Sequence, residues 1–179
     1  MLIRNFFGHL GTVTRHRNMV MKHCFKAGII KRGLLHDLSK FSPTEFFPGV
    51  KYYQGMRSPN EREREVSGYS KAWLHHKGRN RHHFEYWTDY SMKTKKLMPV
   101  PMPDEYIYEM FCDRVAASKI YKKNDYNDRC PLEYFLNGKN TRLIDPTTEE
   151  KLEHLLTILA EKGEEAAFEH IRNCRKNRR

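Results

Sequence analysis

Four of the chain's ten histidines lie within nine residues of one another, in the segment AWLHHKGRNRHHFEYW. These histidines are His75, His76, His82 and His83, and the residues between them include Arg79, Asn80 and Arg81. Imidazoles are ligands for zinc, iron and nickel, and guanidinium groups bind phosphate oxygens. Trp73 and Trp87 flank the segment and would anchor it against a core, which favours an ordered binding site over a solvated basic loop. We therefore expect a metal site with a flank that binds anions.

A His-Asp pair, His36 and Asp37, lies in the apolar segment GLLHDLSKFSP. The periodicity predicts a short helix from Lys31 to Phe41 that is buried almost all round. The flanking apolar residues are Leu34, Leu35, Leu38 and Phe41. Adjacent helical side chains point about 100° apart, so the pair can share one ion only where the helix runs tangent to it. A buried pair without a partner is costly, which leaves an ion pair or a metal site.

Two further ligand candidates lie on helix faces that otherwise carry apolar residues. Asp113 is on the core-facing stripe of a long predicted helix. A carboxylate there requires either a metal ion or a salt bridge to Arg114 or Arg32, and both alternatives stay open. His16 is central on the inward stripe of the first predicted helix. A hydrogen-bonded core histidine is the alternative to metal ligation at that position.

Helical periodicity dominates the elements that must position these residues. Helices are predicted over residues 5–27, 31–41, a short stretch capped by Ser42, 60–77, 104–121, 132–136, a stretch from Pro146 to Gly163, and a last stretch after it. Residues 47–59 are expected to be irregular because they contain two prolines and two glycines, and residues 98–105 to be an extended loop because they contain three prolines. No segment predicts a strand. The expected fold is an all-α, HD-domain-like globule of six or seven helices over residues 1–171, with a basic tail over residues 172–179.

Composition and charge exclude several classes of protein. Apolar residues make up 39% of the chain and aromatic residues 12%, which supports a packed core and excludes a disordered chain. No run of about 18 uncharged apolar residues predicts a membrane span, and the N-terminus lacks a secretory pattern. The four cysteines are widely spread without a C-x-x-C pair, which favours a reduced, cytoplasmic protein. The formal net charge of +11 permits phosphate or nucleic-acid partners without selecting one.

The order of the ligand candidates resembles that of the HD-domain metal-dependent phosphohydrolases. In this chain the order is His16, His36-Asp37, the histidines of residues 76–83, and Asp113. HDLSK is also similar to the HD-x-x-K form of the HD-GYP branch, which implies a role for Lys40 against substrate phosphate. The segments HDLSKFSPTEF, KYYQGMRSPN and AWLHHKGRNRHHFEYW resemble, more closely, a family of small bacterial and phage proteins known only as a domain of unknown function. This second resemblance covers roughly residues 5–160 and implies no activity.

The resemblance to HD-domain enzymes implies a division of roles among these residues. The first metal would be held by His16, His36, Asp37 and Asp113, and a second by His76, His82 and His83. Glu85 or Asp89 would orient the histidines through their free ring nitrogens. Phosphate oxygens would be bound by Lys40, Arg79, Asn80 and Arg114. Asp37 would be both a ligand and the base toward a metal-activated water, with one or two ions of zinc, iron, manganese or nickel.

The leading hypothesis is therefore a metal-dependent phosphohydrolase that acts on a nucleotide or a related phosphate ester. Two alternatives use the same residues differently. One is an HD-type di-iron oxygenase that oxidises a small molecule. The other is a basic helical protein that binds nucleic acid through its RNCRKNRR terminus and holds a structural metal. His154 and His170 are expected to lie outside any metal site.

Overall fold

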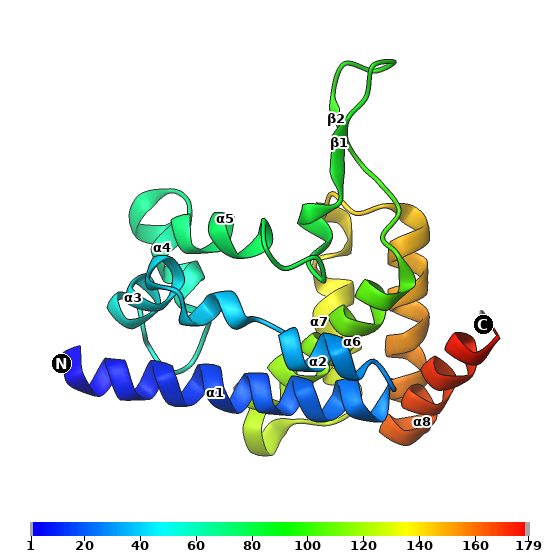
Figure 1. Ribbon diagram of the computed structural model, residues 1–179, viewed down its shortest axis with the longest axis horizontal. Coiled ribbons are helices and arrows are strands. Elements are labelled where there is room, and N and C mark those ends of the chain that lie inside the picture. The colour runs from blue at the N-terminus through cyan, green and yellow to red at the C-terminus, as the bar shows by residue number, and fades with distance from the viewer. Residues whose placement is uncertain (1, 178–179) are drawn as a thin grey trace.

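The computed structural model describes residues 2–177, and α-helices account for most of that range (Figure 1). The helices are α1 (Leu2–Lys26), α2 (Ile30–Leu35), α3 (Pro43–Lys51), α4 (Pro59–Ser67), α5 (Lys71–Lys77), α6 (Asp104–Lys122), α7 (Cys130–Asn137) and α8 (Pro146–Lys176). Short 3-10 turns cover Leu38–Phe41, Phe84–Tyr86, Lys123–Asp125 and Lys139–Thr141. The prediction of a mostly helical single domain is confirmed, with eight α-helices in the described residues where six or seven were expected.

Helix α6 is the centre of the hydrophobic core and packs between α1 and α8. Apolar side chains are buried around much of its circumference, and Phe111 and Val115 are fully buried. A helix covered on several sides has little amphipathic character, because no single face is left to solvent. Helix α8 contributes the expected apolar stripe, which consists of Leu152, Leu155, Leu156 and Leu159. The core therefore holds α6 rigidly, and with it any polar side chain that α6 carries.

The two halves of α8 meet at Gly163, where the expected helix break occurs. Gly163 has φ 83° and ψ 174°, a conformation that is essentially restricted to glycine. Beyond the break, α8 continues to Lys176, so residues 172–176 of the expected basic tail are helical. Arg172 and Arg175 donate hydrogen bonds to the carbonyl oxygens of Lys26 and Gly28, at 2.8 and 2.5 Å. Residues 178–179 lie outside the described range.

Three of the expected element boundaries are wrong. Helix α3 continues through Pro48 to Lys51, so the irregular stretch is shorter than residues 47–59. The helix predicted over residues 60–77 is two helices, because Gly68 adopts a left-handed conformation with φ 76° and ends α4. The helix predicted over residues 31–41 stops at Leu35. Its flanking side chains are about half exposed instead of buried, namely Leu34, Leu35, Leu38 and Phe41.

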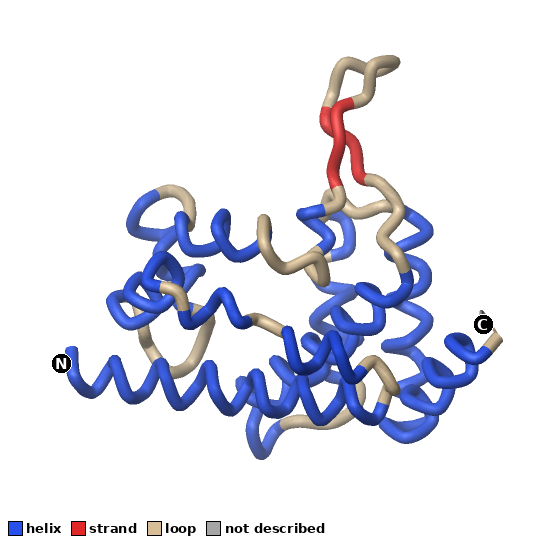
Figure 2. Tube along the Cα trace, in the orientation of Figure 1, coloured by secondary structure: helices blue, strands red, loops and turns tan. Residues whose placement is uncertain are grey.

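A small β-hairpin extends away from the helices, where no strand was expected (Figure 2). Strands β1 (Thr88–Tyr90) and β2 (Leu97–Pro99) are antiparallel, with Asp89 opposite Met98. Each strand has only three residues, too few for a period-two pattern to stand out in the sequence. Within residues 2–177, no helix is long and apolar enough to span a bilayer.

Candidate metal centre

All seven expected metal ligands converge on one region, although they come from separate elements. They form two groups, in each of which one ligand atom per residue lies within 4.8 Å of the others. One group is His16, His36, Asp37 and Asp113, and the other is Asp37, His76, His82 and His83. Helices α1, α5 and α6 supply His16, His76 and Asp113, and loops supply the remaining four residues. Asp37 is common to both groups and lies between them.

The turn at His36 and Asp37 explains how neighbouring residues reach the same centre. Helix α2 ends at Leu35, His36 has an extended ψ of 127°, and Asp37 has φ 53° and ψ 27°. The left-handed region is costly for most L-residues, but aspartate tolerates it better than most. Both side chains are 1% exposed and point into the cluster. The sequence suggested a helix that runs tangent to the ion. In the structure the helix ends at Leu35 instead, and the turn at His36 and Asp37 directs both side chains to the same centre.

Asp113 and the two histidines of the first group lie within contact distance. His16 Nε2 is 2.8 Å from Asp113 Oδ1, and His36 Nε2 is 3.6 Å from the same oxygen. His36 Nε2 is also 3.3 Å from Asp37 Oδ2. The alternative salt bridge from Asp113 to an arginine is wrong, because Arg32 pairs with Glu105 and no ion pair links Asp113 to Arg114 among the described residues.

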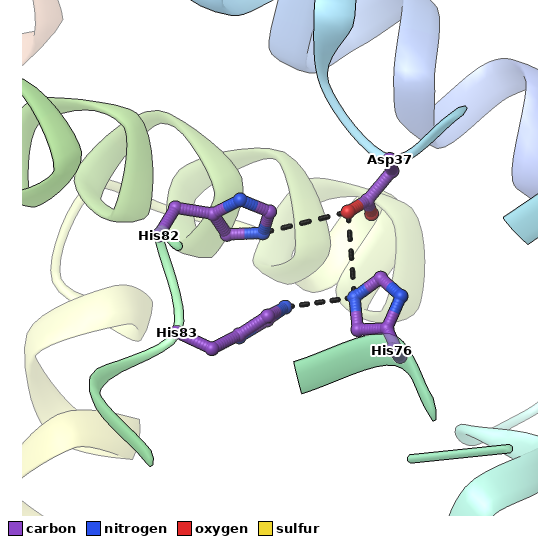
Figure 3. Close-up of side chains that lie close together, drawn as sticks. All are labelled: Asp37, His76, His82 and His83. Atoms are coloured by element: carbon purple, nitrogen blue, oxygen red, sulfur yellow. Dashed lines mark hydrogen bonds and ion pairs between the residues drawn. The ribbon is translucent and has the colours of Figure 1, made fainter. Parts of the chain in front are cut away.

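The second group is built around Asp37 Oδ1 (Figure 3). His76 Nε2 lies 3.3 Å and His82 Nε2 3.5 Å from this oxygen. His83 Nε2 lies 2.8 Å from His76 Nε2. His76 is the inward residue of the pair at 75–76, with 2% exposure, whereas His75 Nδ1 binds Glu45 at the edge of the group. The figure shows the three imidazoles and the carboxylate pointing toward one another.

Two buried glutamates hold the outer nitrogens of these histidines. Glu109 Oε1 accepts from His36 Nδ1 at 2.9 Å and lies 3.1 Å from His82 Nδ1. Glu45 Oε2 accepts from His76 Nδ1 at 2.7 Å. A carboxylate on Nδ1 fixes the ring orientation and leaves Nε2 free to act as a ligand, as is common around protein-bound metals. The expected orienting residues, Glu85 and Asp89, have no contact of this kind among the described residues.

The sequence held a signal for one of these glutamates. Glu109 precedes Asp113 by four residues on α6, so the two carboxylates lie on the same face of that helix. Glu45 lies in the first turn of α3, and nothing in its spacing indicates the contact with His76 on α5.

Several inward atoms of the cluster lack a hydrogen-bond partner within the described structure. They are His36 Nε2, His82 Nε2 and Asp37 Oδ1, and all three are buried. Buried polar atoms are normally paired, because leaving one unpaired costs about 1–3 kcal/mol. Three such atoms directed at one region fit a cation. Mixed imidazole and carboxylate donors suit divalent transition metals.

The protonation of both aspartates, His16 and His83 fits this role. Burial opposes the charge on Asp37, but His36 and Lys40 hold the pKa of its carboxyl well below the usual range. Burial likewise opposes the charge on Asp113, but the hydrogen bond from His16 and the nearby imidazole of His36 hold the pKa of Asp113 well below its usual range. Burial lowers the pKa of His16 and that of His83, which keeps these imidazoles neutral. Ionised carboxylates and neutral imidazoles are the forms that ligate metals. Burial opposes the charge on His36, but Asp37 and Asp113 raise its pKa well above the usual range, so His36 has to release a proton when a metal binds.

The four expected phosphate-binding residues have different surroundings. Lys40 Nζ lies 2.6 Å from Asp37 Oδ2, and its side chain is 30% exposed. Arg114 lines a cavity next to the cluster. Arg79 is exposed and donates to the carbonyl oxygen of His75. Asn80 is buried, and its amide donates to Ser39 Oγ and the carbonyl oxygen of His76, so it orients the site instead of facing a ligand.

Two cavities border the cluster. The smaller one, of about 210 Å³, is lined by His16, Lys40 and His76. The larger one has a volume of about 850 Å³. Their shared lining includes Trp73, His83, Asp113 and Tyr121. Ligand pockets in proteins commonly have about 300–1,000 Å³, so a small organic molecule can reach the cluster through the larger cavity.

The fold and the cluster define a mostly helical protein with a buried histidine-carboxylate centre that opens into a cavity. The family of unknown function DUF5662 matches residues 5–158, so the chain belongs to that family. No curated protein and no solved structure matched the chain.

Proposed function

We propose that this protein is a metal-dependent phosphohydrolase that acts on a nucleotide or a related phosphate ester. The observation that supports this most is the convergence of seven imidazole and carboxylate side chains around Asp37, with inward atoms that have no partner. Two groups with one shared carboxylate favour two ions over one. The donor set is compatible with zinc, iron, manganese or nickel. The protein would work in the reducing cytoplasm, where its four free cysteines persist as thiols.

Each group of the cluster has a defined task in this proposal. His16, His36, Asp37 and Asp113 would hold one ion, and Asp37 with His76, His82 and His83 the other. Such a metal lowers the pKa of a coordinated water and polarises a phosphoryl oxygen. Asp37 is an ionised carboxylate at the junction of both groups and would accept the proton of the attacking water. Lys40, partly exposed beside Asp37, would neutralise charge on the phosphoryl oxygens.

Metal analysis of the purified protein tests the first part of the proposal. We expect one or two equivalents of a transition metal by elemental analysis. A protein that folds stably and takes up no divalent metal after dialysis against zinc, manganese, iron and nickel would end the proposal.

Phosphate release tests the second part. The metal-loaded protein is incubated with a panel of nucleotides and phosphate esters, and inorganic phosphate is measured. We expect release that stops with a chelator and in the Lys40→Gln variant, which should retain its metal. Metal binding without turnover of any ester contradicts the hydrolase. In that case iron content with an oxygen-dependent change in absorption would support the oxygenase alternative.

A further inference from the structure

An unpaired arginine lies in the wall of the larger cavity. Arg114 follows the metal-ligand candidate Asp113 on α6 and lines the cavity of about 850 Å³. Its Nε is buried and has no hydrogen-bond partner among the described residues. No carboxylate of that range lies within 4.0 Å of its guanidinium. Arg114 as a whole is partly exposed, but leaving its buried Nε donor unpaired costs free energy, and unsatisfied groups of this kind occur mainly at functional sites.

Arg142, which lies next to Arg114, has the hydrogen-bond partners that Arg114 lacks. Arg142 and Arg114 both lie over the ring of Phe135, with Cζ at 4.7 and 5.6 Å from the ring centroid. Arg142 donates to the carbonyl oxygens of Phe135 and Tyr134, which end α7. The guanidinium of Arg142 therefore has two acceptors. The guanidinium of Arg114 has none among the described residues, and the positive charge of Arg142 lies near it. Burial, and then the charge of Arg142, lower the pKa of Arg114.

Two carboxylates near Arg114 compensate part of this charge from a distance. Asp113 and Glu85 both act to raise the pKa of Arg114, but neither forms an ion pair with it. Glu85 Oε2 is itself buried without a hydrogen-bond partner. Asp113 is already engaged by His16 and His36. The side chain of Arg114 lines the cavity, and its guanidinium forms no hydrogen bond or ion pair among the described residues.

The cavity connects this guanidinium with the metal cluster. His83 and Asp113 line the cavity and belong to the cluster, and the cations Arg64, Lys77 and Lys122 also line it. A single phosphoryl group at the metals would leave most of 850 Å³ unfilled. Trp73 and Tyr134 offer aromatic surface between the charged groups.

We propose that the substrate carries a second phosphate, remote from the one that is hydrolysed, and that Arg114 binds it. This inference rests on the proposed function for the first phosphate only. A guanidinium suits phosphate oxygens because its fork of N–H donors matches two of them at once. The second phosphate belongs either to a small bisphosphorylated molecule or to the next linkage of an oligonucleotide.

Direct binding tests the subsite without any turnover. The probe is inorganic phosphate, titrated calorimetrically into full-length protein with a chelator present, so that the metal cluster contributes no binding. We expect Arg114→Gln to weaken phosphate binding tenfold or more. The matched control is Arg129→Gln, because Arg129 is exposed and does not line the cavity. Equal affinity in wild type and Arg114→Gln, or no phosphate binding by the wild type, overturns the subsite.

Thermal unfolding checks that Arg114 has no structural partner. The Arg114→Met variant keeps an apolar side chain over Phe135 and removes the unpaired charge. We expect its melting temperature to be higher than that of the wild type, and we expect added phosphate to raise the melting temperature of the wild type only. A lower melting temperature of Arg114→Met would show that the guanidinium is paired in solution, for example with Glu85, and would contradict the subsite.

Turnover then identifies the source of the second phosphate. Adenosine 3′,5′-bisphosphate, adenosine 5′-monophosphate and a 5′-phosphorylated dinucleotide are compared by kcat/KM with metal-loaded protein. A preference of tenfold or more for either substrate with two phosphates, lost in Arg114→Gln, supports the subsite and tells the small bisphosphate from the oligonucleotide. An unchanged preference in Arg114→Gln overturns the subsite but leaves the hydrolase. Phosphate binding that depends on Arg114, without turnover of any substrate, supports the subsite while the hydrolase fails.

Discussion

Glu109 provides the most direct test of whether the buried histidines are metal ligands. Its Oε1 lies 2.9 Å from His36 Nδ1 and 3.1 Å from His82 Nδ1, and the residue is 5% exposed. Both contacts are to the same oxygen, so in Glu109→Gln an amide oxygen in that place still accepts from both histidines, but it carries no negative charge. A neutral acceptor holds the two Nδ1–H groups less tightly than a carboxylate does, so Nε2 of both imidazoles becomes a weaker ligand.

The expected magnitude follows from this loss. Removing a carboxylate that orients a metal-bound histidine weakens metal affinity about 10–100-fold, or about 1.4–2.7 kcal/mol. At a fixed excess of metal, the stabilisation by binding falls by the same free energy. For a domain of this size the rise in melting temperature on adding metal should shrink by about 3–10 °C.

The assay compares metal affinity and melting temperature for the wild type and two variants. Affinity is measured by competition with a chromophoric chelator, using zinc and then manganese. The control is Glu105→Gln, which makes the same substitution one turn earlier on α6, where the side chain is 52% exposed and pairs with Arg32. If Glu109→Gln binds both metals as tightly as Glu105→Gln does, the histidines are ordinary buried hydrogen-bonding residues and the metal centre is refuted.

Three further predictions concern the cluster, the acid stability and the backbone. Asp113→Ala should remove the ion of the first group and so lower the metal content measured by elemental analysis, whereas His170→Ala, on α8 outside both groups, should leave the metal content unchanged. Burial, and then Lys119, lower the pKa of His23 to about 4 from 6.5, so its contribution to stability is complete above pH 6.5 and is lost as the pH falls toward 4. Urea unfolding should show that loss as about 3 kcal/mol, and His23→Gln should remove it; an equal loss in that variant contradicts the assignment. Gly163→Ala should destabilise the fold by about 1–3 kcal/mol in the same assay, because φ is 83° there, and an unchanged free energy of unfolding would show that the two halves of α8 can straighten.

The sequence was sufficient to predict which side chains converge, because ionisable residues on apolar helix faces need a common partner. Asp113 and His16 each interrupt an apolar stripe, and in the structure they contact one another at 2.8 Å. Proline and glycine also marked the ends of a helix correctly. Helix α8 begins at Pro146, after the N-cap Asp145, and it is interrupted at Gly163. These signals are local, and local signals can be read without knowing the tertiary contacts.

The features that the sequence did not predict depend on distant contacts or on single backbone angles. The apolar residues around His36 and Asp37 gave a continuous helical pattern, yet the helix ends before them. The two side chains are buried in the cluster, while Leu35 stays exposed. The role of Glu45 depends on α5 packing against α3, which no periodicity reveals. Arg114 was expected to bind phosphate, but its lack of a partner could be recognised only in three dimensions.

At Asp37 the residue type that would suit the backbone best differs from the one that the candidate metal centre needs. Glycine adopts such angles without steric cost, whereas an L-residue there gives up about 1–2 kcal/mol. Engineering this chain for heat resistance would therefore single out Asp37→Gly as an attractive relaxation of the turn. The same change would delete the carboxylate that joins both halves of the centre. Selection for thermal stability alone would therefore favour a variant that lacks a ligand of both candidate metal sites.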